Sequence, residues 1–236
     1  VVCIDKIDIK SHIKNNSKSY RTTAFLEPSK TFFEEIGIWK EIEKHSCPMN
    51  SLKLVDTKLL NDYLTVEATK TFSNEESNTL GWNIKNNDMI KVLFEIAKKE
   101  KNISFFPNTT IETFKVTDEF VEINLSNKKH FNAKLIVGSD GRDSFIRNEL
   151  NIKSTTKVHG QNALTFGIQH EKPHKSISNE IYYSGGPFTT VPIKNNSNEN
   201  YSSVVWMDEE IASENLMKLD KSSFEQEINK RSAGIL

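Results

Sequence analysis

Residues 134–152, KLIVGSDGRDSFIRNELNI, restrict the possible folds of this chain more than any other segment. The apolar run at 135–137 is short and partly β-branched, as in a buried strand, and a charged segment with helical spacing follows it. Asp140 and Gly141 stand between them, a pair that is common in turns. These residues alone leave two interpretations open. The pair is either the ligand-binding edge of an open α/β sheet or a plain turn before a surface helix.

The distribution of arginine draws attention to the same stretch. The chain has 27 lysines and only four arginines, namely Arg21, Arg142, Arg147 and Arg231. A guanidinium group is planar and carries several donors, so it suits phosphate and carboxylate groups better than an ammonium does. In a chain so rich in lysine, we expect arginine mainly where a guanidinium group is needed. Two of the four lie within residues 134–152.

Length and charge exclude several classes of protein. The chain has 236 residues, which suffices for one large domain or two small ones, and a net charge of −1. With a net charge so close to zero, the chain has no overall electrostatic field that would attract nucleic acid or an anionic membrane. No apolar run reaches the roughly 20 residues of a membrane span. Cys3 and Cys47 match no metal-ligand spacing. His170 and His174 have the i, i+4 spacing of metal ligands on a helix, but Pro173 between them argues against a helix, so no metal site is predicted. We expect a soluble, cytoplasmic protein.

The order of predicted elements is mixed, with strands and helices interleaved. Because the chain opens inside a strand without an initiator Met, we expect its natural start to lie upstream.

The pattern of strands and helices favours α+β layers added to a nucleotide-binding α/β core. We predict strands at 1–5, 51–68 (a pair), 103–107, 110–117, 120–126, 130–138, 162–171, 180–184, 188–194 and 201–207, helices at 29–45, 87–102, 143–151 and twice within 208–231, and a loop at 6–20.

Several segments, in order along the chain, resemble one family. VGSDGRDSFIR resembles the Asp-Gly motif of class A flavoprotein monooxygenases, aromatic hydroxylases that use FAD and a reduced nicotinamide. Further segments are similar to successive pieces of the ubiquinone-biosynthesis hydroxylases in that class: RTTAFLEPSKTFFEEIGIWKEI, GWNIKNNDMIKVLFE, HGQNALTFGIQHEKPH, GGPFTTVPI and SSVVWM. The resemblance implies an α/β plus α+β fold, in which an incomplete FAD/NAD(P)-binding Rossmann-like domain carries an antiparallel β-sheet substrate domain.

The resemblance also implies a domain division. Residues 1–48 and 81–152 correspond to the FAD-binding domain, and residues 49–80 and 153–236 to the substrate domain. The sequence contains neither the family's N-terminal Gly-x-Gly-x-x-Gly loop nor the later Gly-Asp segment that cradles the flavin. We therefore expect the chain to be the middle of such an enzyme.

Cofactor-binding positions follow from the resemblance residue by residue. Asp5 matches the acid that ends the second strand and binds the adenosine ribose, although an ordinary strand-end aspartate is the alternative. Arg21 matches an arginine on the phosphate side of FAD. Asn86 falls where the family has a polar side chain near the ribityl chain. Ile111 stands where a backbone group meets the adenine.

The remaining matches lie in the opening stretch. Asp140 and Gly141 correspond to the centre of the Asp-Gly motif, which the family links to both FAD and the nicotinamide cofactor. Ser144 and Arg147 complete the motif, and for Arg147 a mainly structural role is expected. Asn87 departs from the family, where an arginine is common at that position.

The implied activity is aromatic hydroxylation with FAD as cofactor, NADH or NADPH as reductant and O2 as oxidant. A polyprenylated phenol of ubiquinone biosynthesis is the expected substrate, which implies loose association with a membrane surface or a biosynthetic complex. Because the cofactor carries the chemistry, no catalytic side chain is assigned. His159, His170 and His174 are interpreted as structural. The alternatives are a hydroxylase of another small aromatic compound, or a non-catalytic fragment that does not bind FAD.

Overall fold

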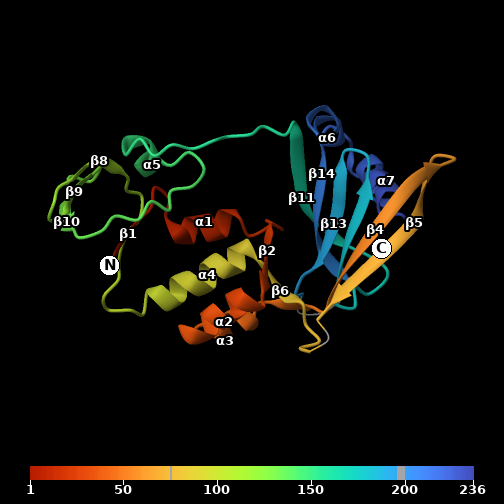
Figure 1. Ribbon diagram of the computed structural model, residues 1–236, viewed down its shortest axis with the longest axis horizontal. Helices are drawn as coiled ribbons and strands as arrows, with labels where there is room; N and C mark the ends of the chain where they lie inside the picture. Colours follow the sequence, from red (N-terminus) through yellow and green to blue (C-terminus); the bar gives the residue numbers. More distant parts are fainter. Residues whose placement is uncertain (75, 196–199) are drawn as a thin grey trace. The chain divides into compact units, whose positions relative to one another are not determined.

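The computed structural model describes residues 1–74, 76–195 and 200–236. The chain forms two compact units, Val1–Asn15 with Ala97–His159 and Asn16–Ile96 with Gly160–Leu236. Within the described ranges, the first unit holds a two-stranded and a three-stranded sheet, and the second holds a three-stranded and a six-stranded sheet (Figure 1). These units follow the packing of the chain. The division into FAD-binding and substrate domains stays a prediction.

The first unit is built around a small antiparallel meander. Strand β9 (Val121–Leu125) buries alternate residues, as the period of a strand requires, and pairs with its neighbours on both sides. Apolar residues from the rest of the unit pack against this core, among them Ile4, Ile111 and Ile136. The other elements of the unit are β1 (Val2–Ile4), α1 (Ile9–Asn15), β7 (Ser104–Phe106), β8 (Ile111–Val116), β10 (His130–Ala133) and α5 (Phe145–Glu149), with β1 and β7 parallel.

The strand predicted at 130–138 is shorter than expected. Strand β10 ends at Ala133, and Leu135 and Val137 are each 74% exposed. Ile136, between them, packs on the meander core, so this segment covers the core with one face only. No strand pairs with residues 134–139 in the part of the chain that the structure describes. The prediction of a buried strand before Asp140 was therefore wrong.

The predictions of a loop at 6–20 and of a single helix at 29–45 also need correction. The loop predicted at 6–20 contains α1, where Asp8 accepts hydrogen bonds from the backbone N and the Oγ of Ser11, both at 2.9 Å. Only Ile9 and Ile13 are apolar in α1, and neither is buried, so the helical signal in the sequence is weak. The single helix predicted at 29–45 is two helices, α2 (Glu27–Glu35) and α3 (Trp39–Glu43). They are separated at Gly37, whose φ of 76° falls in the region that glycine favours.

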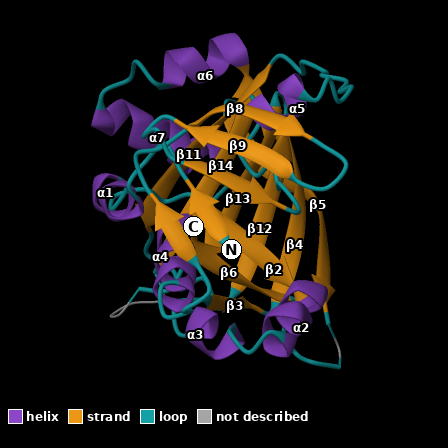
Figure 2. Cartoon of the chain, turned by 90° about the vertical axis from the view of Figure 1, so that its left-hand side faces the viewer, coloured by secondary structure: helices purple, strands orange, loops and turns teal. Residues whose placement is uncertain are grey.

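A three-stranded antiparallel sheet begins the second unit. Its order is β2 (Thr22–Leu26), β6 (Gly81–Lys85) and β3 (Cys47–Met49). Helices α2, α3 and α4 (Asn86–Ala97) lie beside it (Figure 2). Phe25, Ile42 and Ile84 are buried between these elements.

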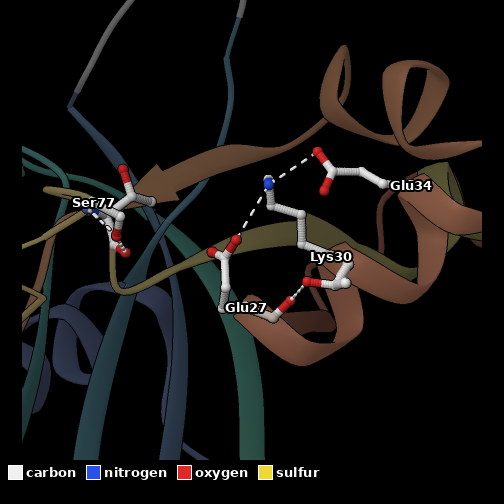
Figure 3. A network of polar contacts seen from close by, with 6 residues as sticks. Glu27, Lys30, Glu34 and Ser77 are labelled. Atoms are coloured by element: carbon white, nitrogen blue, oxygen red, sulfur yellow. Dashed lines mark hydrogen bonds and ion pairs between the residues drawn. The ribbon is translucent and has the colours of Figure 1, made fainter.

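A polar network stabilises the surface of α2. The Nζ of Lys30 lies 3.2 Å from a carboxylate oxygen of Glu27 and 2.9 Å from one of Glu34 (Figure 3). The same ammonium lies 5.5 Å from the centre of the Trp82 ring on β6. Lys30 therefore links the helix to the sheet as well as to its own neighbours.

The six-stranded sheet forms the rest of the second unit. Its order is β11 (Gln161–Gln169), β14 (Tyr201–Glu209), β13 (Gly186–Pro192), β12 (Ile177–Tyr183), β4 (Ser51–Leu60) and β5 (Tyr63–Ser73). Neighbouring strands are antiparallel except for β12 and β4, which are parallel. The strand pair predicted at 51–68 and the four later strands are confirmed. Asn61 and Asp62 turn the β4–β5 hairpin with positive φ values of 48° and 63°.

The two faces of this sheet differ. Helices α6 (Glu210–Leu216) and α7 (Lys221–Arg231) cover one face, where Ile228 packs in a core with Val204 and Phe188 (Figure 1). Phe166 faces the same core, so the next residue, Gly167, faces the other side of the sheet. There the backbone of Gly167 meets the ring of Tyr20. The segment that carries Arg21 thus reaches the face without α6 and α7.

Candidate cofactor-binding site

The Asp-Gly turn, residues 138–146, is held together by the carboxylate of Asp140. Its oxygens accept hydrogen bonds from the Oγ of Ser144 at 2.5 Å and the backbone N of Ile146 at 3.2 Å. Ser144 in turn caps α5, because its Oγ accepts from the backbone N of Arg147 at 3.0 Å. The hydrogen bond from Ser144 lowers the pKa of the Asp140 carboxyl. Asp140 is therefore ionised at neutral pH and fixes the turn to the start of the helix.

Glycine is needed twice in this turn, for different reasons. Gly141 has a φ of 92°, and an added Cβ there would meet nothing within 4 Å. An added Cβ at Gly138 would lie 3.0 Å from the Cβ of Ile146, so the backbone passes close to α5. The turn is thus packed on its helix side and open at Gly141. An open backbone next to a carboxylate fits the approach of a nucleotide.

Asp5 stands at the carboxyl end of β1, the strand that pairs in parallel with β7. Its backbone N donates to the carbonyl of Phe106 at 3.1 Å, and its own carbonyl accepts from the N of Thr109 at 3.0 Å. Its Oδ1 accepts from the backbone N of Ile7 at 2.9 Å, and the residue is exposed. Ligands of α/β sheets bind beyond such strand ends, so the position suits a ribose contact.

The predicted residues of the first unit surround one core. Asp5 follows Ile4, and Asp140 follows Ile136 by four residues; both isoleucines pack on the meander. Ile111 begins β8 and contacts the same core with its side chain. The structure thus places Asp5, Ile111 and Asp140 at segments that pack on β9.

Arg21 and Asn86 come together in the second unit. The carbonyl of Arg21 accepts from the backbone N of Asn86 at 2.9 Å, and Thr23 Oγ1 donates to Asn86 Oδ1 at 2.7 Å. The Arg21 side chain is exposed and makes no ion pair with any residue that the structure describes. An uncompensated guanidinium of this kind fits a phosphate group.

The sequence did not reveal what positions Arg21. Ser203 Oγ donates to the carbonyl of Tyr20 at 2.6 Å, and Ser203 is the register partner of Gly167 across β14 and β11. An added Cβ at Gly167 would lie only 2.1 Å from Cδ1 of Tyr20. A glycine inside a predicted strand is a known sign of close approach, and this was the signal available.

Comparison with known proteins decides the family. A model of the FAD binding domain matches residues 9–233, nearly the whole chain. The chain belongs to the FAD binding domain family. This confirms the family resemblance and agrees with a turn that is open at Gly141 beside an ionised Asp140.

Two curated relatives carry names from ubiquinone biosynthesis. The chain is 24% identical over 243 residues to the mitochondrial ubiquinone biosynthesis monooxygenase COQ6 of Dictyostelium discoideum, covering 93% of this chain and 48% of that protein. It is 24% identical over 213 residues to the ubiquinone hydroxylase UbiL of Rhodospirillum rubrum, covering 89% and 47%. The chain therefore spans about half the length of these relatives.

Solved structures share the fold. PqsL of P. aeruginosa, in complex with 2-aminobenzoylacetate, matches all of this chain and 62% of its own with a TM-score of 0.77 at 14% identity. The flavin-dependent halogenase CmlS matches all of this chain and 42% of its own with a TM-score of 0.70. The fold class is confirmed: FAD/NAD(P)-binding α/β elements combined with a largely antiparallel sheet. In the ranges that the structure describes, no helix is long and apolar enough to cross a membrane.

Proposed function

We propose that this chain forms part of an FAD-dependent monooxygenase that uses NADH or NADPH and O2 to hydroxylate an aromatic ring. The observation that carries the proposal is the Asp-Gly turn, with an ionised Asp140 and an open Gly141, in a chain of the FAD binding domain family. The relatives named above support a polyprenylated phenol of ubiquinone biosynthesis as the substrate. Such a substrate favours loose association with a membrane surface or a biosynthetic complex.

In the first unit, we assign three kinds of contact to FAD and the nicotinamide. Asp5 accepts hydrogen bonds from ribose hydroxyl groups, since its carboxylate is exposed and, among the residues that the structure describes, one of its oxygens accepts from Ile7. The backbone of Ile111 meets the adenine. Gly141 lets the cofactor approach the backbone, while Asp140, whose carboxylate holds the turn, keeps that backbone in place.

In the second unit, Arg21 donates to a phosphate and Asn86 to the ribityl chain. Since Oδ1 of Asn86 already accepts from Thr23, its Nδ2 is the group that donates. When bound, FAD supplies the electron transfer and oxygen activation, and the side chains of this chain bind and orient it. No side chain is assigned as a catalytic acid or base.

Titration of FAD into the gene product that contains this chain tests the cofactor assignment. Flavin fluorescence is measured for the wild type, Asp5→Asn and Arg21→Gln, with Lys6→Gln and Lys18→Gln as matched exposed controls. Loss of one charged hydrogen bond is expected to weaken FAD binding about tenfold in each test variant and to leave the controls unchanged. A folded protein that ignores FAD would contradict the proposal and favour the non-catalytic alternative.

Isotopically labelled O2 tests the reaction and the substrate class. A prenylated phenol and its unprenylated analogue are each incubated with the holoenzyme and NADH or NADPH, and the products are analysed by mass spectrometry. The proposal expects one labelled oxygen atom in the prenylated product and a lower kcat/KM for the analogue. Equal or better turnover of the unprenylated compound would favour the hydroxylase of another small aromatic.

A further inference from the structure

A patch of exposed apolar side chains lies at one end of the six-stranded sheet. It is formed by the tip of the β4–β5 hairpin and by the connection between α6 and α7 (Figure 1). The two segments are neighbours, because Leu59 of the hairpin and Leu219 of the connection line the same pocket. Contiguous exposed apolar residues mark interaction sites more often than scattered ones do. The residues of this apolar patch are each 40–72% exposed and are Leu59, Leu60, Tyr63, Met217 and Leu219.

The pocket between the two segments carries an excess of negative charge. It has a volume of about 680 Å³, and its charged lining residues are Asp62, Asp208, Glu209, Glu227, Lys230 and Arg231. Lys230 is already engaged, since its Nζ lies 2.7 Å from a carboxylate oxygen of Glu227. Asp62 and Glu209 are exposed and form no ion pair with any residue that the structure describes. The pocket therefore fits a group that brings a positive charge.

The connection between α6 and α7 carries the opposite charge. Lys218 stands between Met217 and Leu219, is exposed, and forms no ion pair within the described part of the chain. The backbone here is ordered, because the N of Met217 donates to the carbonyl of Ser213 and the N of Lys218 to that of Asn215, each at 3.1 Å. An ordered turn thus presents a cation flanked by two apolar side chains.

One end of the molecule thereby offers an acid-lined pocket and an apolar segment with a cation next to each other. Such a surface is complementary to a second copy of itself, since a two-fold axis brings each segment onto the pocket of the other copy. In such an interface the apolar residues supply most of the affinity, and the charges select the partner and the register. An anionic membrane fits less well, because it would repel the carboxylates of Asp62 and Glu209.

We propose that this chain forms a symmetric dimer through this end of the six-stranded sheet. Lys218 of each copy lies against Asp62 and Glu209 of the other, and the two apolar patches cover each other. Tyr20 contacts the face of the sheet opposite to α6 and α7, so the dimer leaves the segment of Arg21 uncovered. The inference stands whether or not the chain belongs to a hydroxylase.

Sedimentation equilibrium of the gene product that contains this chain tests the dimer. The wild type is expected to self-associate with a Kd on the order of micromolar or below. Tyr63→Ala removes an aromatic anchor and Lys218→Glu reverses a charge, so each is expected to raise the Kd at least about tenfold. Phe32→Ala on α2 and Lys40→Glu on α3 are exposed changes of the same two kinds and should leave the Kd unchanged. Circular dichroism checks that each variant is folded.

An exchange of charges makes the test specific to the proposed contacts. A chain with both Asp62→Lys and Glu209→Lys is expected to dimerise as poorly as Lys218→Glu. Mixing these two chains should restore a dimer with one copy of each, because every contact across the interface then joins opposite charges. Each variant alone would still repel its own copies.

Three results would overturn the proposal. The wild type could stay monomeric at concentrations on the order of 100 μM. A dimer could form whose Kd neither Tyr63→Ala nor Lys218→Glu changes, which would place the interface elsewhere. The mixed variants could stay monomeric although both are folded, which would mean that Lys218 does not face the carboxylates. A monomer that sediments with phosphatidylcholine vesicles, and loses this with Tyr63→Ala, would assign the apolar patch to a lipid surface instead.

Discussion

Replacing Gly167 by alanine is expected to displace the segment that holds Arg21. The added Cβ would lie 2.1 Å from Cδ1 and 2.3 Å from Cε1 of Tyr20, whereas carbon atoms in contact stay about 3.5 Å apart. The ring must therefore move by more than about 1 Å, which strains the 2.6 Å hydrogen bond from Ser203 Oγ to the Tyr20 carbonyl. Overpacking of this kind costs about 1–3 kcal/mol, and a lost hydrogen bond about 0.5–1.5 kcal/mol.

We expect Gly167→Ala to reduce the free energy of unfolding by about 2 kcal/mol, a fall in Tm of about 4–8 °C for a chain of this size. Thermal unfolding followed by circular dichroism measures it. Tyr20→Ala removes the ring, so in that background Gly167→Ala is expected to be neutral or stabilising by up to about 1 kcal/mol. An equal loss in both backgrounds would refute the contact between Gly167 and Tyr20 as the cause.

Three further predictions concern other parts of the chain. The pKa of Asp140 is lowered by folding, so its stabilising effect is present above the unfolded pKa of about 3.9 and lost as the pH falls through the folded value. The Tm difference between wild type and Asp140→Asn should therefore shrink as the pH falls below about 3.9, and a constant difference would contradict this. Gly37→Ala is expected to lower the free energy of unfolding, measured in urea, by about 1 kcal/mol, and Gly37→Asn by less. An added Cβ has space at this position, but the positive φ is unfavourable for alanine and better tolerated by asparagine, so equal losses would argue against this cause. Lys30→Met is expected to lower the free energy of unfolding, measured in urea, by less than about 1 kcal/mol. The loss should be smaller still in 1 M NaCl, because salt screens the ion pairs of the wild type; a loss that does not depend on salt would point to packing instead.

Much of the six-stranded sheet was predictable because its signals are local. The centres of β11 and β14 carry β-branched and aromatic residues, and the Asn61-Asp62 turn marks the β4–β5 hairpin. Sequence signals failed where the burial of a residue depends on segments that lie far away along the chain. The apolar residues Leu135 and Val137 suggested a buried strand, but in this structure only Ile136 finds a core.

The same distinction applies to the candidate site. The turn at Asp140 could be predicted because Ser144 and Ile146, which bind its carboxylate, follow within six residues. The support of Arg21 could not, because Ser203 lies 183 residues from Tyr20 along the chain. Family resemblance suggested the roles that are proposed for single residues. The structure supplied the neighbours that hold them.

The parallel pairing of β12 with β4 constrains the order in which the chain can fold. Thr57 Oγ1 donates to the carbonyl of Tyr182 at 2.6 Å, and 125 residues separate the two. The β4–β5 hairpin is made early, whereas β12 emerges only after the chain from Ala97 to His159 has been synthesised. At about 5–20 residues per second, the completed hairpin waits on the ribosome for about 6–22 s before β12 has been made.

During this interval one edge of the hairpin lacks its partner, and Leu59, Leu60 and Tyr63 stay exposed even in the folded chain. Unpaired strand edges with apolar side chains invite association with other chains. The nascent chain is therefore most vulnerable to aggregation between the synthesis of β5 and that of β12. Its yield in a cell should depend on chaperones that bind extended apolar segments during synthesis.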